Sequence, residues 1–190
     1  MKSKLALTVL CLVVVAAILS GCTTNAPTPT PTAKSDISKT DAVSGASRVV
    51  DEAEFELKVS RENTNYMVIT SKDLTFTKDI TVESGVKKSN DGASDTVTRS
   101  LGFGSYKEDN KTLDKRYTIT VPRLIIAGEN VKFEYGIIKG DVYVTGGGFN
   151  IKDGTIDGNL YFATDELKNA FKLDETTKIT GNTEVKVLAQ

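Results

Sequence analysis

The chain has 190 residues, with 24 Lys and Arg against 25 Asp and Glu, so its formal net charge is −1. This balance, without a strong basic patch, argues against nucleic acid as a partner. The sequence contains no histidine and two cysteines, Cys11 and Cys22. Histidine-based catalysis and His-ligated metal sites are therefore excluded, and we expect neither a metal ion nor another cofactor.

The first part of the chain has the organisation of a secretory signal peptide. Lys2 and Lys4 give it a basic start, and residues 5–19 carry no charge and are rich in Leu, Val, Ala and Ile. A helix of about 15 residues spans roughly 22 Å, which is short of a hydrocarbon core of about 30 Å. We therefore expect residues 1–21 to be a signal peptide rather than a membrane span.

The segment Leu19-Ser20-Gly21-Cys22 resembles the lipobox of prokaryotic lipoproteins at all four positions. In that family a diacylglycerol is attached to the cysteine thiol, and a dedicated peptidase cuts before the cysteine. The resemblance implies that Cys22 is lipidated, that this anchor makes a membrane the partner, and that the protein is extracytoplasmic; two acyl chains suffice for stable anchoring. The alternative is an ordinary signal peptide with a chance cysteine. Because Cys11 would leave with the signal peptide, the mature chain would have no disulfide.

Residues 22–47 are expected to form the lipidated cysteine and a Thr/Pro-rich linker. Between Thr23 and Thr32 lie three of the four prolines, and no aliphatic side chain there is larger than alanine. Such a stretch cannot bury enough apolar area to offset its chain entropy, and alternating prolines keep it extended. The linker would hold a single domain, residues 48–190, away from the membrane.

The domain is expected to begin with a short helix and to continue with strands. Asp51 is placed to cap a helix that brings Phe55 and Val59 onto one face, whereas the alternation of Phe55, Leu57 and Val59 also allows a strand. We favour the helix. Further along the chain, β-rich runs between polar turns predict strands at residues 66–70, 74–76, 80–82 and 117–121.

The clearest organisation is a repeat, which is strongest within residues 124–187. Residues 138–144 (IKGDVYV) recur after 18 residues as 156–162 (IDGNLYF) and, more weakly, after a further 23 residues as 179–185 (ITGNTEV). A fixed period with short apolar runs between turns is the signature of a parallel β-helix, in which successive coils stack about 4.8 Å apart. We therefore predict a mainly β domain, a short right-handed parallel β-helix (a solenoid) with one or two short helices.

Stacking the repeats predicts which residues become neighbours. Val142 would lie over Leu160, and Val144 over Phe162 over Val185, all pointing inward. One glycine from each repeat would stack at a corner that needs positive φ, a hydrogen-bonded Asp/Asn ladder would run beside them, and tyrosines would stack on the outer face. The three sets are Gly140, Gly158 and Gly181; Asp141, Asn159 and Asn182; and Tyr143 with Tyr161.

The greater length of the last period predicts a helix that bulges from the repeat. Thr164 is placed to cap a helix of one to two turns within residues 165–171, with two acids in its first turn and with Leu167 and Phe171 on one face. An apolar strand at 171–173 would follow, equivalent to those at 131–133 and 149–151.

Residues 117–187 resemble the polymer-forming, bactofilin-like β-helix proteins through the repeated Ile-x-Gly-[Asp/Asn]-x-x-hydrophobic pattern. They are also similar to a group of secreted proteins of clostridia-type bacteria that pair Gly-Asp-Val-Tyr-Val with a following Asp-Gly-Asn-x-Tyr-Phe. The resemblance implies the β-helix fold and suggests self-association. End-to-end contact through residues 184–190 would cover the last coil, because no amphipathic capping helix follows it. The alternating charges of Glu184 and Lys186 argue in part against such open-ended pairing, so we favour a capped monomer over self-association.

The sequence favours a non-enzymatic surface lipoprotein with a structural or binding role. Tyr143 and Tyr161 are the candidate surface for cell-wall polysaccharide, although an aromatic ladder also stabilises a sheet without any ligand. The alternative function is a carbohydrate-binding or carbohydrate-active β-helix of the cell envelope, such as a polysaccharide lyase or hydrolase. Its charged groups would be Asp141, Asp153, Asp157, Lys139 and Lys152. Acids at turns are common for backbone reasons, so we assign no catalytic residue.

Overall fold

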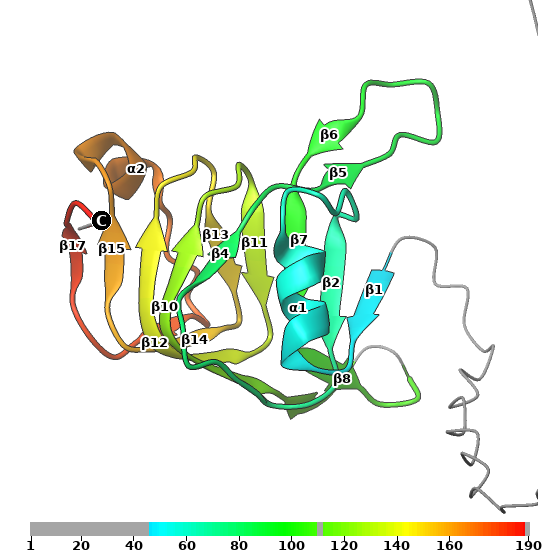
Figure 1. The fold of residues 1–190 in the computed structure, drawn as a ribbon, viewed down its shortest axis with the longest axis horizontal. Coiled ribbons are helices and arrows are strands. Elements are labelled where there is room, and N and C mark those ends of the chain that lie inside the picture. The colour runs from blue at the N-terminus through cyan, green and yellow to red at the C-terminus, as the bar shows by residue number, and fades with distance from the viewer. Residues whose placement is uncertain (1–45, 110–111, 189–190) are drawn as a thin grey trace, which may run out of the picture. The chain divides into compact units, whose positions relative to one another are not determined.

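The computed structural model describes residues 46–109 and 112–188; the expected signal peptide, Cys22 and nearly all of the linker lie outside this part. The described chain is mainly β, with two short helices, and most of its strands lie in two parallel sheets (Figure 1). Sheet 1 contains, in spatial order, β1 (Ala46–Val49), β2 (Met67–Thr70), β7 (Arg99–Gly102), β11 (Val131–Glu134) and β13 (Asn150–Lys152). Strand β1 thus begins inside the stretch that the sequence assigned to the linker.

Sheet 2 contains eight strands. They are β3 (Leu74–Thr75), β4 (Ile80–Val82), β10 (Thr118–Ile126), β12 (Ile137–Val144), β14 (Thr155–Asp157), β15 (Leu160–Phe162), β16 (Lys178–Ile179) and β17 (Thr183–Val185). Two antiparallel hairpins project from the sheets. They are β5 (Val86–Lys87) with β6 (Thr96–Val97), and β8 (Gly104–Tyr106) with β9 (Leu113–Arg116).

From β2 to β14 the chain alternates between the two sheets, and each later strand of a sheet pairs with a strand from an earlier pass. Strands β7, β11 and β13 pair in parallel in sheet 1, while β10, β12 and β14 pair in parallel in sheet 2. The register reproduces the sequence repeat, since Val142 lies beside Leu160 and Leu160 lies beside Thr183. The repeats found in the sequence are therefore neighbours in space.

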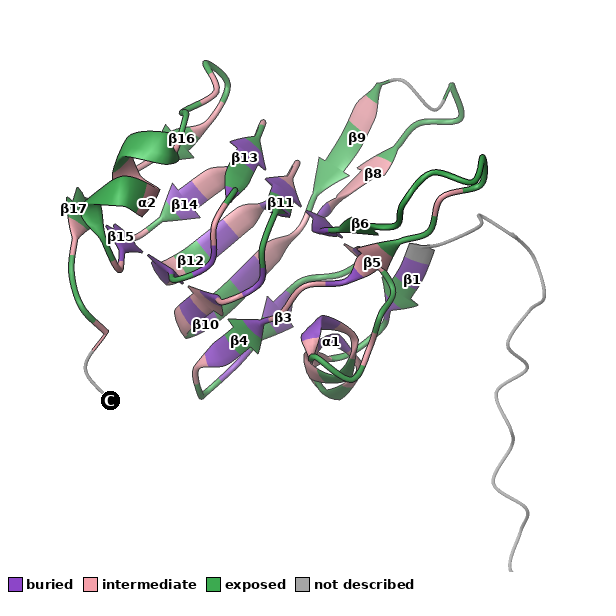
Figure 2. Ribbon diagram, turned by 90° about the horizontal axis from the view of Figure 1, so that it is seen from above, coloured by how far each residue is buried: buried purple, intermediate pink, exposed green. Residues whose placement is uncertain are grey.

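The hydrophobic core fills the space between the two sheets (Figure 2). Sheet 1 contributes one row of fully buried side chains across four strands, Val68, Leu101, Phe133 and Ile151. The inward residues predicted for sheet 2 are confirmed by register and burial: Val142 and Leu160 are fully buried, and Val144 and Phe162 are 1% exposed. Val185, beside Phe162 in the last strand, is half-buried.

Helix α1 (Glu52–Val59) confirms the helix that the sequence favoured at this position. The Asp51 side chain caps it by accepting a hydrogen bond from the Glu54 N–H at 2.8 Å. Phe55 and Val59, one turn apart, are fully buried in the core. The helical period therefore wins over the strand period because it places both large apolar side chains on the covered face.

Helix α1 also covers the first edge of sheet 2. The Glu52 carboxylate accepts a hydrogen bond from the Thr75 N–H of β3 at 3.0 Å. At the other end of the helix, the Val59 carbonyl accepts from the Glu83 N–H at 2.8 Å. These contacts occupy backbone donors that an uncovered edge would leave unpaired.

Helix α2 (Asp165–Ala170) is the predicted bulge, capped by Thr164 as expected. Phe171 follows it, and its ring centroid lies 6.0 Å from that of Phe149 and 5.3 Å from that of Phe162. The expectation of a strand directly after this helix is wrong. Phe171 ends the helix and packs its ring against the core, so the chain leaves sheet 1 without adding another strand to it.

Candidate functional site

The predicted glycine corner exists, but its glycines are required for two different reasons. Gly140 has φ +137°, a conformation that favours glycine. Gly158 and Gly181 are not in this region, so positive φ was the wrong prediction for them. They are required by close packing instead: a Cβ at Gly158 would overlap the Gly140 carbonyl oxygen, and a Cβ at Gly181 would lie 2.6 Å from the Gly158 carbonyl oxygen. Each glycine thus lets one backbone corner rest directly on the next.

Beside the glycines, Asp141, Asn159 and Asn182 form the predicted ladder. Asp141 Oδ1 accepts hydrogen bonds from the Asn159 N–H at 3.0 Å and from Asn159 Nδ2 at 2.9 Å. Asn159 Oδ1 in turn accepts from the Asn182 N–H at 2.9 Å. Each side-chain oxygen therefore satisfies a main-chain donor of the next repeat, which gives this row a structural task.

Tyr143 and Tyr161 stack as predicted, but they do not form an open surface. Their ring centroids lie 4.6 Å apart on neighbouring strands, and only 7% and 6% of the two residues is exposed. Lys186 lies over the Tyr161 ring, with Nζ 4.5 Å from the centroid, and the hydroxyl of Tyr143 and then that of Tyr161 raise the pKa of its amine. The prediction that this pair forms an exposed binding surface is therefore wrong, because the pair lacks the free ring face that a sugar needs.

The acids that suggested polysaccharide chemistry do not gather. Asp141 belongs to the ladder, and Asp157 accepts a hydrogen bond from Thr180 Oγ1 at 3.1 Å on sheet 2. Asp153 follows β13 of sheet 1 and forms an ion pair with Arg116. The three carboxylates are used separately, each by its own neighbour.

Aromatic and charged side chains do gather where hairpin β8–β9 meets the turns after β11 and β13. We call this group the hairpin corner. It consists of Tyr106, Arg116, Glu134, Tyr135, Lys152 and Asp153. Tyr135 and Asp153 follow paired residues of β11 and β13 and have φ of +66° and +49°. Left-handed backbone is uncommon for a residue such as tyrosine, and it recurs at functional sites.

The hairpin corner is held by specific contacts. The ring of Tyr106, a residue that is 40% exposed, stands edge-on to Tyr135 with the centroids 5.5 Å apart. Arg116 Nη2 lies 2.8 Å from both carboxylate oxygens of Asp153. Lys152 Nζ lies 5.8 Å from the Tyr135 ring centre. Burial and the hydrogen bond with Tyr135 raise the pKa of Tyr106, so its hydroxyl stays protonated at neutral pH.

Sequence reasoning found only Lys152 and Asp153 of this group. Arg116 and Asp153 are 37 positions apart in the chain, and their contact exists because the hairpin folds back onto the turn after β13. The available signal was Tyr106, a large aromatic residue inside an otherwise polar and charged loop.

The sequence analysis did not identify Arg99, whose side chain donates hydrogen bonds to six main-chain carbonyls. It is fully buried, yet it forms no direct pair with a carboxylate among the described residues. Six main-chain carbonyls accept its hydrogen bonds, those of Lys58, Ser60, Asn63, Asn65, Glu83 and Ser84. Burial lowers its pKa to about 10, which leaves it charged at neutral pH. The guanidinium ties the end of α1 to two loops and to β7.

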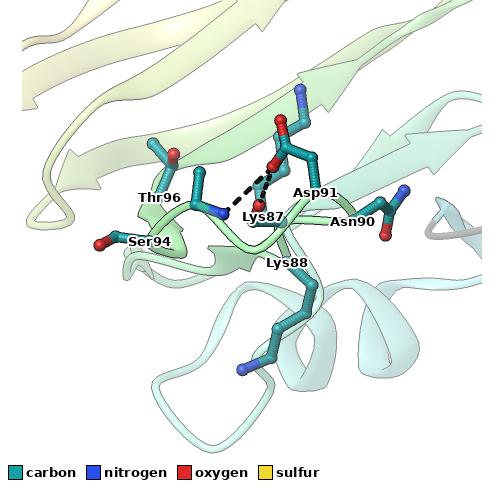
Figure 3. Close-up of a pocket in the computed structure, with 8 residues that line it drawn as sticks. Lys87, Lys88, Asn90, Asp91, Ser94 and Thr96 are labelled. Carbon is teal, nitrogen blue, oxygen red and sulfur yellow. Dashed lines mark hydrogen bonds between the residues drawn. The ribbon is translucent and has the colours of Figure 1, made fainter.

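Hairpin β5–β6 carries an open polar pocket of about 360 Å³ (Figure 3). Asp91 Oδ1 points into the loop and accepts hydrogen bonds from Ser89 Oγ at 2.5 Å and from the Ala93 N–H at 3.2 Å. Lys88 Nζ lies 2.5 Å from an Asp95 carboxylate oxygen. These charged groups are engaged within the loop, so the pocket offers a ligand little that is not already bonded.

Within residues 46–109 and 112–188, three or more potential metal-binding side chains do not cluster anywhere, and neither α1 nor α2 has the length and apolar character that a membrane span requires. No protein-family model matches the chain, and no curated protein or solved structure is significantly similar to it. Its function is therefore inferred from the residues themselves.

Proposed function

We propose that the chain is a lipid-anchored surface protein that displays a short right-handed parallel β-helix with a structural or binding role and no catalytic role. The observation that carries the anchor is the uncharged segment ending in Leu19-Ser20-Gly21-Cys22. The Thr/Pro-rich linker supports it, because an extended spacer is what a tethered domain needs to stand clear of a membrane.

The β-helix is supported by three independent features of the described chain. The chain alternates between two parallel sheets, and its repeats stand in register. Gly140, Gly158 and Gly181 remove the side chains that would keep successive corners apart. The Asp141 and Asn159 side chains then bond each corner to the next. A repeat whose polar groups serve its own stacking is well suited to be a scaffold.

Metabolic labelling with a fatty-acid analogue tests the anchor in cells. The wild-type chain and Cys11→Ala should both be labelled, because Cys11 lies in the segment that is removed. Cys22→Ala should lose the label and leave the membrane fraction. Equal labelling of Cys22→Ala and wild type would contradict the anchor, whatever the fold of the domain.

A second candidate function, carbohydrate binding, is favoured by the hairpin corner. Tyr106 offers a partly exposed aromatic ring beside hydrogen-bonding groups that are held in place, which suits the apolar face and the hydroxyls of a sugar. Two cations, Arg116 and Lys152, stand beside three carboxylates, those of Glu134, Asp153 and Asp174. Because negative charge exceeds positive charge here, the ligand of this site would be a neutral glycan rather than a polyanion.

Binding to isolated cell-wall polysaccharide tests the second function. Tyr106→Ala should weaken binding at least about tenfold, as loss of a central aromatic contact does in other interfaces. Tyr66→Ala, which removes a tyrosine near the other hairpin, is the matched control and should bind as the wild type does. Unchanged binding by Tyr106→Ala would remove the hairpin corner as the site. Release of reducing ends that Asp153→Asn abolishes would contradict the non-catalytic role.

A further inference from the structure

Strand β17 is an edge strand with one side of its backbone open. Within the described chain it pairs only with β15. The Asn182 carbonyl accepts from the Leu160 N–H at 2.8 Å, and the Lys186 N–H donates to the Phe162 carbonyl at 2.9 Å. Because backbone groups alternate in direction along a strand, those of residues 183, 185 and 187 point away from β15. They form a row of donors and acceptors ready for a further strand.

This edge differs from the opposite edge of sheet 2. Helix α1 covers that one, through the bonds of Glu52 to Thr75 and of Val59 to Glu83. At the β17 side, helix α2 packs its apolar residues against the core but forms no hydrogen bond with the strand edge that the structure records. Val187, just beyond β17, is 79% exposed. Figure 1 shows β17 as the outermost strand of the sheet.

We propose that two copies of this chain pair through β17, antiparallel and about a twofold axis at Val185. In this register Val185 lies opposite Val185 of the second copy, and Thr183 lies opposite Val187. The backbone N–H and C=O groups of residues 183, 185 and 187, which point away from β15, then pair with those of the second copy. This pairing gives about six main-chain hydrogen bonds. In the dimer, each copy covers the Val187 side chain of the other, which is exposed in the single chain.

The side-chain charges select this register. Glu184 and Lys186 lie on the same face of the strand, and antiparallel pairing centred on Val185 places each Glu184 opposite Lys186 of the second copy. Directly opposed unlike charges stabilise a pair of strands, whereas like charges destabilise it. A shift of the centre by one residue would place Glu184 opposite itself. The strand is thus complementary to its own copy in one register.

A twofold contact closes on itself. Each copy contributes the β17 side of sheet 2, and among the described residues the opposite edge of that sheet is occupied by α1. We therefore infer a closed dimer and not a filament. Because the contact is small, it is concentration-dependent, and anchoring of both copies to one membrane would favour it by raising their effective concentration. The geometry of the dimer does not depend on the anchor.

Disulfide trapping tests the register in the full chain, purified in mild detergent with Cys11→Ser and Cys22→Ser as background. Val185→Cys places two thiols at the twofold axis, where paired Cα atoms about 5.5 Å apart suit a disulfide. Thr183→Cys is the matched control, because residues 183 of the two copies would lie roughly 13 Å apart. We expect Val185→Cys to give at least about tenfold more crosslinked dimer than Thr183→Cys under mild oxidation. Equal yields from the two variants, or no dimer from either, would overturn the proposal.

Charge exchange provides an independent measurement that needs no cysteine. In sedimentation equilibrium, Glu184→Lys should weaken the dimer at least about fivefold, because it places the new lysine directly opposite Lys186 of the second copy. Adding Lys186→Glu to the same chain restores unlike pairs and should restore most of the association. A double variant as weak as Glu184→Lys, or species larger than a dimer in the wild type, would contradict the twofold contact.

Discussion

Replacing Arg99 with alanine should bring the domain close to unfolding at room temperature. The guanidinium is fully buried and donates to six main-chain carbonyls. A buried acceptor left without its partner costs about 1–3 kcal/mol, and a typical domain is stable by about 5–15 kcal/mol. The Ser60 carbonyl also accepts from the Asn63 N–H, so at the lower figure the other five acceptors together lose about 5 kcal/mol. Water that enters the vacated space would satisfy some of these carbonyls and reduce the loss. The sum is therefore an upper value at about 1 kcal/mol per acceptor.

Two further variants make the Arg99 test quantitative. Arg99→Lys offers about three N–H donors in place of five, so its stability should lie between those of wild type and Arg99→Ala. Arg61→Ala is the control, because the Arg61 side chain is 85% exposed and forms a surface ion pair with Glu83 at 3.3 Å. Its effect should stay within about 0.5 kcal/mol.

Urea unfolding followed by circular dichroism measures these effects on residues 41–190, the unit that holds the whole core. We expect the order wild type and Arg61→Ala, then Arg99→Lys, then Arg99→Ala. If Arg99→Ala and Arg61→Ala had equal midpoints, water would be serving the carbonyls as well as the guanidinium does. The inference that this side chain holds α1, the loops and β7 together would then fail.

Three other substitutions test the fold at separate places. Gly158→Ala should lower the thermal midpoint by several degrees, because the new Cβ would overlap a carbonyl oxygen of the preceding repeat, whereas Gly147→Ala, with no atom within 4 Å of its new Cβ, should change it little. Val144→Asp places a charge at a position that is 1% exposed, so it should cost several kcal/mol, and an unchanged melting curve would mean that the inward assignment is wrong. The hydrogen bond from Thr75 lowers the pKa of Glu52 from 4.5, so its contribution to stability is present above that pH and lost as the pH falls through the lowered pKa. Glu52→Gln keeps an acceptor but cannot titrate, and thermal melts between pH 7 and pH 3 should show a weaker acid dependence than in wild type.

Much of the fold could be predicted from the sequence because its determinants are local or periodic. The cap of α1 needs only Asp51 and the four residues that follow it, and Thr164 marks α2 in the same way. The repeat fixes the register of β12, β15 and β17 because identical spacing places equivalent residues side by side. Such information is contained in a short window or in a comparison of the chain with itself.

The remaining features depend on contacts that no window contains. The acceptors of Arg99 are main-chain carbonyls, which every residue possesses, so no residue type signals them. Tyr143 and Tyr161 were correctly placed on the outer side of their strands, but their burial depends in part on the position of Lys186. The period also suggested one reason for all three corner glycines, whereas only Gly140 has positive φ.

The ladder beside those glycines yields a prediction in which charge alone is changed. Asn159→Asp keeps the size of the side chain but replaces the Nδ2 donor, 2.9 Å from Asp141 Oδ1, with a second carboxylate oxygen. Loss of the bond and repulsion between the two carboxylates should destabilise the variant by about 1–3 kcal/mol at pH 7. The repulsion raises the pKa of the carboxylate pair in the folded state, so the variant is most stable below about pH 4 and loses stability as the pH rises through the raised pKa. Asn182→Asp is the control, because Asn182 lies next to the amide of Asn159 rather than next to a carboxylate. Thermal melts from pH 4 to pH 7 should show a deficit that grows with pH for Asn159→Asp and stays small for Asn182→Asp; a deficit independent of pH would mean that the Asp141 carboxylate does not hold this corner.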